Sequence, residues 1–266
     1  MIQLTDVYKA FGDKQVLRGF SLDVKEGETM VIMGYSGSCK SVAIKHIVGL
    51  LTPDRGSVKV DGLEVPKLRR SELYELRAHI GYVFQFAALF DSLTVGENVA
   101  MGLRNRGGFS GAELDKRVAE ALDLVDLPDV APRFPAELSG GMRKRVGIAR
   151  AIALRPKYLL YDEPTTGLDP VTGAVIDNVM LRMQRTLGVT GIVITHEPGA
   201  TTTTRVPRIQ VRIRAGGTCT TLQSCSRRPT SLTRTSTSTT VRTRAARARQ
   251  APPRNGTASR SRPSSR

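Results

Sequence analysis

The sequence predicts an α/β domain with a mainly parallel sheet over residues 1–197. Two observations lead to this prediction. Short, wholly apolar runs typical of buried strands alternate with longer segments in which apolar residues recur at helical spacing. Turn-forming segments such as TPDRG at 52–56 separate one element from the next.

The expected elements follow one another in a regular order along the chain. Apolar runs predict buried strands at Met30–Met33, at Tyr158–Tyr161 and at 191–195. The helix that starts at residue 110 opens with Ser110 and Glu113 at the spacing of a capping box. The expected helices cover residues 41–51, 71–79, 110–127, 140–154 and 171–187.

The loop after the first buried strand has the form of a phosphate-binding site. Residues 34–41, GYSGSCKS, nearly fit the pattern G-x-x-x-x-G-K-[ST]. In such a loop, backbone N–H groups surround the phosphates of a nucleotide, and the following helix N-terminus adds positive potential. We therefore expect a P-loop core in which Lys40 neutralises phosphate charge and Ser41 ligates Mg²⁺. The other nucleotide-binding positions of the loop are Gly34, Ser36, Gly37, Ser38 and Cys39.

Position 39 departs from this pattern, because cysteine stands where the pattern has glycine. Glycine is needed where the backbone approaches phosphate closely or adopts a conformation that is costly for a residue with a Cβ atom. We therefore expect Cys39 to weaken nucleotide binding and hypothesise that Cys39→Gly raises the affinity.

The segment 137–170, ELSGGMRKRVGIARAIALRPKYLLYDEPTTGLDP, resembles the ATPase subunit of ABC transporters. LSGGM matches the signature of that family, and YLLYDEP places Asp162 and Glu163 at the end of an apolar strand. An isolated Asp-Glu pair is more often a solvated loop pair, but this pair also precedes PTTGLD. Adjacent carboxylates at a strand end can serve a metal ion and a water molecule separately.

The resemblance implies a role for each matching residue near the phosphates. Asp162 would support Mg²⁺, and Glu163 would polarise the attacking water. His196, in VITHE, would be the switch histidine that faces the γ-phosphate. Gln85, in GYVFQF, matches the Q-loop, which reaches both Mg²⁺ and the water and adjoins the surface where the membrane subunit docks.

The same resemblance implies a nucleotide shared between two copies of the chain. Ser139, Gly140 and Gly141 would cap the γ-phosphate held by the second copy, and Asp169 would communicate between the copies. Hydrolysis of ATP with Mg²⁺ would therefore require a head-to-tail dimer. Phe11, in KAFG, would stack on adenine, although a phenylalanine of the core is the alternative interpretation.

Several segments look like the ATPase of Mce/Mla-type lipid transport systems, with phospholipid or sterol-like cargo. They are LSGGM with its Met142, the RKRVGIARAIA that follows, and ALFDSLTVGENV after Gln85. This resemblance implies a multi-spanning permease and a lipid-binding substrate protein as partners. Met142 alone would also be explained by packing, because an unbranched thioether fills irregular gaps.

The domain organisation expected is an ABC ATPase domain at 1–197, with an inserted helical subdomain at about 86–150, and a separate tail. Residues 198–266 hold 15 Thr and 15 Arg but no aromatic and no acidic residue, which favours disorder. They lack the strands and helices that the family usually has there. We hypothesise a frameshift near residue 198; a basic arm for nucleic acid or anionic lipid is the alternative.

Composition limits the remaining functions. The formal charge of +16 lies almost entirely in the tail, because residues 1–197 hold 25 basic and 24 acidic residues, a net charge of +1. We therefore expect no nucleic-acid partner for the globular part. No signal peptide or membrane span is apparent, so we expect a cytoplasmic protein, peripheral at the inner face of the cell membrane. Cys39, Cys219 and Cys225 are expected to be free thiols.

Two other functions remain compatible with these patterns. Cys39 and the foreign tail would fit a catalytically impaired nucleotide-binding remnant. A soluble ABC ATPase that acts on nucleic acid is a further alternative, although such proteins usually carry two cassettes or large insertions.

Overall fold

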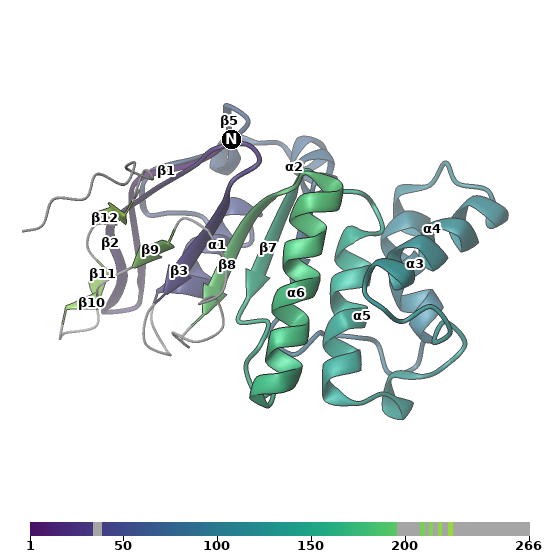
Figure 1. Ribbon diagram of the computed structural model, residues 1–266. Helices are drawn as coiled ribbons and strands as arrows, with labels where there is room; N and C mark the ends of the chain where they lie inside the picture. The colour runs from purple at the N-terminus through teal and green to yellow at the C-terminus, as the bar shows by residue number, and fades with distance from the viewer. Residues whose placement is uncertain (34–38, 196–207, 211–212, 215–217, 220–222, 226–266) are drawn as a thin grey trace, which may run out of the picture. The chain divides into compact units, whose positions relative to one another are not determined.

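The computed structural model in Figure 1 describes residues 1–33 and 39–195, together with the backbone of segments 208–210, 213–214, 218–219 and 223–225. Its central sheet has the strand order β12-β9-β3-β8-β7-β6. Neighbouring strands from β9 to β6 run parallel, and β12 is antiparallel to β9. These strands are β3 (Thr29–Met33), β6 (Ile80–Val83), β7 (Tyr158–Asp162), β8 (Thr190–Thr195), β9 (Arg208–Gln210) and β12 (Gln223–Cys225).

A second sheet has the order β10-β11-β2-β1-β4-β5 and is antiparallel except between β11 and β2. The long hairpin of β1 and β2 turns at Gly12, whose φ of 56° suits glycine. Its strands are β1 (Ile2–Phe11), β2 (Lys14–Val24), β4 (Arg55–Val60), β5 (Leu63–Glu64), β10 (Ile213–Arg214) and β11 (Thr218–Cys219).

Four short segments of the tail are described by their backbone, as strands β9–β12. Strands β9 and β11 pair with β3 and β2, each of which would otherwise present an unpaired edge. Backbone N–H and C=O groups at a strand edge can pair with almost any extended segment, whatever its side chains. The rest of the tail, for which the sequence predicts disorder, lies outside the described residues.

The helices agree with the sequence patterns, with one addition. The bounds of α1, α2, α4, α5 and α6 lie within four residues of the expected ones, and Ser110 and Glu113 form the expected capping box. Helix α3 lies within the expected helical subdomain but was not predicted individually, although Thr94 and Glu97 form the same type of box. The helices are α1 (Lys40–Ile47), α2 (Arg70–Ala78), α3 (Val95–Arg106), α4 (Gly111–Leu124), α5 (Gly140–Ile152) and α6 (Pro170–Leu187), with 3₁₀ turns η1 (Val65–Lys67) and η2 (Pro135–Glu137). Among the described helices, none combines the length and the apolar character that crossing a bilayer requires.

Two hydrophobic cores lie on opposite faces of the central sheet. Along β7, Leu160 belongs to the core shared with α1 and the antiparallel sheet, whereas Leu159 and Tyr161 belong to the core formed with α3–α6. Successive side chains of a strand point to opposite faces, so a strand buried on both sides must be apolar throughout. Helices α5 and α6 lie side by side against the face of the sheet that carries Leu159 and Tyr161 (Figure 1).

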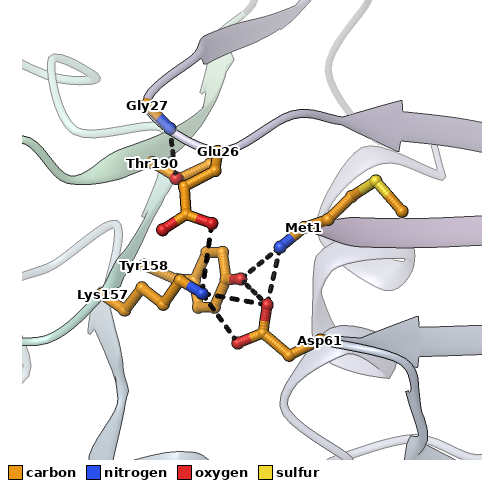
Figure 2. Close-up of polar contacts among 7 residues, drawn as sticks. All are labelled: Met1, Glu26, Gly27, Asp61, Lys157, Tyr158 and Thr190. Carbon is orange, nitrogen blue, oxygen red and sulfur yellow. Dashed lines mark hydrogen bonds and ion pairs between the residues drawn. The ribbon is translucent and has the colours of Figure 1, made fainter.

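A polar cluster joins the two sheets at the amino end of β7 (Figure 2). The carboxylate of Asp61, in the turn between β4 and β5, accepts hydrogen bonds from the amino group of Met1, from the hydroxyl of Tyr158 and from the ammonium of Lys157. Lys157 also forms an ion pair with Glu26 at 3.4 Å. Partial burial raises the pKa of Asp61, but the three donors outweigh it and lower the pKa to about 2. The charged carboxylate therefore stabilises the contact between the sheets.

We predict that Asp61→Asn lowers the free energy of unfolding at neutral pH by about 1 kcal/mol, an amount limited by the partial exposure of the carboxylate. The folded-state pKa is depressed, so this stabilisation is present above the ordinary pKa of about 4. It is lost as the pH falls toward 2. Urea unfolding at neutral pH and near pH 3 should show a smaller difference from wild type at the lower pH. Asp115→Asn, an exposed site on α4, is the control. Equal stability of Asp61→Asn and wild type at neutral pH would contradict the prediction.

Candidate functional site

The predicted site residues follow three parallel strands of the central sheet. Lys40 and Ser41 begin α1, which comes after β3 and the loop 34–38; Gln85 follows β6; and Asp162 ends β7. The carboxyl ends of parallel strands lie at one edge of the sheet, which is where ligands bind in open α/β sheets. The topology therefore brings residues from distant parts of the sequence to one edge.

Asp162 is held between two of these elements. Its Oδ1 accepts a hydrogen bond of 2.6 Å from the hydroxyl of Ser41, and its Oδ2 accepts one of 2.9 Å from the hydroxyl of Tyr82. The residue is only 8% exposed. A buried carboxylate requires such donors, because burying it without them would be costly. Helix α1 and strand β6 together fix its position.

Glu163 has an unusual backbone conformation, with φ of 51°. Its N–H still donates to the carbonyl of Ile194 on β8 at 3.1 Å, so the turn occurs at the strand end itself. In a continued strand, the side chains of residues 162 and 163 would point to opposite faces. The left-handed conformation redirects the carboxylate of Glu163. A non-glycine residue pays a free-energy cost for this backbone strain, and strained residues are concentrated at functional sites.

The carboxylate of Glu163 gathers polar partners from three segments. Its Oε2 accepts hydrogen bonds from Gln85 Nε2 at 3.2 Å and from Thr166 Oγ1 at 3.1 Å. Its Oε1 lies 4.0 Å from Nζ of Lys40, which is only 2% exposed. The buried lysine and the buried carboxylate therefore compensate part of each other's charge.

A second buried lysine forms a hydrogen bond to the loop that follows Asp162 and Glu163. The ammonium of Lys144, on α5, donates to the carbonyl of Thr166 at 2.6 Å. Burial lowers the pKa of Lys144, and the negative charge of Glu163 opposes this effect. The contact links helix α5 to the segment that carries Thr166 and hence to Glu163.

The loop after Gln85 is held in place by α5. Ala87 and Ala88 have φ of 59° and 48°, which is strained for residues with a Cβ atom. Arg150 donates to their two carbonyl oxygens at 2.7 and 2.6 Å. Two hydrogen bonds from one guanidinium can maintain a conformation that the loop would not adopt alone. Phe86, between Gln85 and these alanines, is 82% exposed.

The signature residues and Asp169 lie at two neighbouring helix N-termini. Ser139 caps α5 by accepting from the N–H of Met142 at 3.2 Å, and Asp169 caps α6 by accepting from two N–H groups at 3.0 Å. Hydrogen bonds from Thr172 and Val171 hold the pKa of Asp169 below its ordinary value. A Cβ atom added at Gly141 would lie 2.5 Å from the Thr172 side chain, so glycine allows the two helices to approach. Ser139 and Gly140 are exposed.

Phe11 lies at the end of β1 and is 47% exposed. This exposure is inconsistent with the alternative interpretation of a core phenylalanine. The ammonium of Lys9 lies 5.7 Å from the ring centroid, a cation–π distance. The ring is therefore available on the surface.

Some predicted residues lie outside the described part of the chain: Gly34, Ser36, Gly37, Ser38 and His196. Other residues of the site were not identified from the sequence: Tyr82, Lys144, Arg150 and Thr166. A tyrosine in a strand, or a basic residue in a helix, carries no sequence signal that separates it from packing or surface positions. Thr166 is the exception, because it belongs to PTTGLD, the segment that follows the acidic pair.

Comparison with known proteins identifies the family. The family model described as ABC transporter matches residues 17–166. The chain belongs to the ABC transporter family. The membership of this family that the sequence resemblance implied is thereby confirmed.

Curated relatives of this cassette include transport proteins with different cargoes in their names. One is the probable ribonucleotide transport ATP-binding protein mkl of Mycobacterium leprae, 40% identical over 73% of this chain and 56% of the relative. Another is the methionine import ATP-binding protein MetN of Carboxydothermus hydrogenoformans, 49% identical over 66% of this chain and 52% of the relative. The chain thus spans about half the length of the curated relatives it matches.

Solved structures show the same cassette fold. The dimeric post-hydrolysis state of the ATP-binding cassette MJ0796, bound to ADP and Pi, has a TM-score of 0.75 at 35% identity, over 85% of this chain and 99% of that chain. The structure of cbiO1 from Clostridium perfringens, part of the ABC transporter complex cbiONQ, has a TM-score of 0.72 at 29% identity, over 83% of this chain and 87% of that one.

The donor atoms at the strand ends fit Mg²⁺. Ser41 and Asp162 supply hard oxygen donors that lie 2.6 Å apart, and Mg²⁺ prefers oxygen ligands from one or two carboxylates together with substrate phosphates. Within residues 1–33 and 39–195, no group of three His, Cys, Asp or Glu side chains is arranged to hold a metal ion. The donor set therefore suits a metal bound jointly with a phosphate ligand.

The geometry of Cys39 differs from what the sequence led us to expect. Its φ of −63° and ψ of 0° lie where any L-residue is comfortable, so the backbone does not require glycine. Its side chain is 3% exposed and belongs to the core around α1, so it does not occupy the open edge of the sheet. The backbone conformation therefore gives no reason to expect Cys39 to weaken nucleotide binding.

We now predict that Cys39→Gly leaves the affinity for a fluorescent ATP analogue within about twofold of wild type, a difference below about 0.5 kcal/mol. The same change should lower the free energy of unfolding by about 1–2 kcal/mol, through the lost apolar burial and the added backbone entropy. Cys39→Ala, which keeps the Cβ atom, is the matched control. An affinity that rises tenfold for Cys39→Gly but not for Cys39→Ala would restore the original hypothesis.

Proposed function

We propose that this chain is the ATP-binding and ATP-hydrolysing subunit of an ABC transporter. The observation that supports this most strongly is the convergence of Lys40, Ser41, Gln85, Asp162 and Glu163 at one edge of the central sheet. The same residues were selected from separate sequence motifs. Their meeting in space is what a nucleotide site requires.

In the proposed site, residues 34–41 bind the triphosphate. The N-terminus of α1 presents N–H groups, and Lys40 supplies a buried positive charge beside it. Ser41 and Asp162 would hold Mg²⁺, with Gln85 nearby. When bound, Mg²⁺ would neutralise charge that develops on the phosphates. The exposed ring of Phe11 would stack on the adenine.

Glu163 is the proposed base in hydrolysis. Gln85 and Thr166 hold one oxygen of its carboxylate, which fixes its direction. From this position it would orient a water molecule toward the γ-phosphate and accept its proton. His196, which follows Thr195 in the sequence and lies outside the described residues, would contact the γ-phosphate as the resemblance implies.

The proposed active form is a head-to-tail dimer. Ser139, Gly140 and Asp169 lie at neighbouring helix N-termini, and Ser139 and Gly140 are exposed. Helix N-termini attract anions, so this surface suits the γ-phosphate held by a second copy. Closing and opening of the dimer would drive a multi-spanning permease, with the chain peripheral at the inner face of the membrane.

The cargo is proposed to be phospholipid or another lipid, delivered with a lipid-binding substrate protein. The segments RKRVGIARAIA and ALFDSLTVGENV support this proposal by their likeness to Mce/Mla-type systems. Met142 adds little, because it packs against the second core and packing explains it. The names of the two relatives mention ribonucleotide transport and methionine import. Of these, methionine import is the second candidate for the cargo.

We predict that Glu163→Gln slows phosphate release from ATP by about 100-fold or more, the usual contribution of a positioned base. The affinity for ATP should change little, because the glutamine keeps the shape of the side chain. Glu75→Gln is the control, since that side chain is 67% exposed on α2. With ATP bound, Glu163→Gln should elute as a dimer, and adding Ser139→Ala should weaken that dimer. Equal rates for wild type and Glu163→Gln would favour the non-hydrolysing remnant.

The cargo is tested by purifying the full chain with the products of its neighbouring genes from detergent-solubilised membranes. Mass spectrometry of the complex should find a multi-spanning permease and bound phospholipid. A complex that instead binds methionine, and no lipid, would contradict the lipid proposal but leave the ATPase proposal intact.

A further inference from the structure

Tyr82 occupies a position beside the site that the proposed function does not explain. It lies on β6 opposite Leu160 of β7. Alternate residues of a strand face the same side, so Tyr82, Leu160 and Asp162 share the face of the sheet that α1 covers. The ring of Tyr82 packs against the core on that face and lies 4.5 Å from the ring of Phe84.

The hydroxyl of Tyr82 contacts Asp162 from the side opposite to Ser41. Tyr82 donates to Oδ2 at 2.9 Å, whereas Ser41 donates to Oδ1 at 2.6 Å. Each oxygen is thus held by a different element of the fold. Two donors on two oxygens restrict rotation of the carboxylate about its Cβ–Cγ bond, which a single donor would not do.

In this contact the Tyr82 hydroxyl is the donor and the Asp162 carboxylate is the acceptor. A bond from a neutral donor to a charged acceptor is stronger than one between neutral groups.

Packing alone does not account for a tyrosine at this position. Phenylalanine would fill the same space and would bring no polar atom that needs a partner. The hydroxyl is the only difference, and its contact is a carboxylate of the proposed metal site.

We infer that Tyr82 is a positioning residue that holds the Asp162 carboxylate in the orientation needed to bind Mg²⁺ beside Ser41. This inference rests on the proposed function, because it assigns Asp162 to the metal. Groups that hydrogen-bond to metal ligands are known to set the metal affinity of the site.

The test compares nucleotide binding with and without Mg²⁺ in the full chain. The probe is a fluorescent, non-hydrolysable ATP analogue, titrated once with Mg²⁺ in excess and once with EDTA. The ratio of the two affinities measures the contribution of the metal. The variants are Tyr82→Phe, Asp162→Asn and the double variant, and Tyr74→Phe on α2 is the matched control.

We expect Tyr82→Phe to reduce this ratio by about tenfold, the lower end of the range for groups that orient metal ligands. The affinity in EDTA should not change, and Tyr74→Phe should match wild type in both conditions. The double variant should have the same ratio as Asp162→Asn, since Tyr82 acts through Asp162. A purely structural role would shift both affinities together.

Three results would overturn the inference. The first is an unchanged ratio in Tyr82→Phe while Asp162→Asn loses the metal contribution, which would leave the proposed function standing. The second is an equal loss with and without Mg²⁺. The third is an unchanged ratio in Asp162→Asn itself, which would also remove Asp162 from the proposed metal site.

Discussion

The hydrogen bond between Ser41 and Asp162 is the contact on which the site depends. It joins the first turn of α1 to the end of β7, across 121 positions of sequence. Neither residue could reach the other unless β3 and β7 ran in the same direction and lay in the same sheet. The parallel pairing of β3, β8 and β7 provides this, and two apolar cores keep the sheet rigid. The chemistry at the strand ends is therefore a consequence of the topology.

Burying charge at this edge of the sheet is costly, and the structure offsets the cost locally. Lys40, Asp162 and Glu163 are each at most 8% exposed, and their contacts pair opposite charges or supply hydroxyl and amide donors. The strained backbone at Glu163 and at Ala87 lies around the same site. Strain and buried charge in one place are expected where a site is organised for a ligand rather than for stability.

Much of this arrangement could be predicted from sequence because the signals were local. Apolar runs located β3, β7 and β8 of the central sheet but not β6, and capping residues located α4. Helix α3 was not predicted individually, although its Thr94 and Glu97 carry the same capping signal. The ordinary backbone conformation at Cys39 could not be predicted, because a pattern records which residue is usual and not which φ the backbone adopts. Tyr82 could not be found, because only the fold shows that its hydroxyl faces Asp162. The strands β9–β12 depend on free sheet edges, which composition does not reveal.

The most direct measurement of the central claim is a crystal structure of the Glu163→Gln chain with ATP and Mg²⁺. We expect the triphosphate against residues 34–41, with the Lys40 ammonium on a phosphate and the metal in contact with Ser41 and Asp162. A nucleotide bound elsewhere on the chain, or bound with its metal away from Asp162, would contradict it.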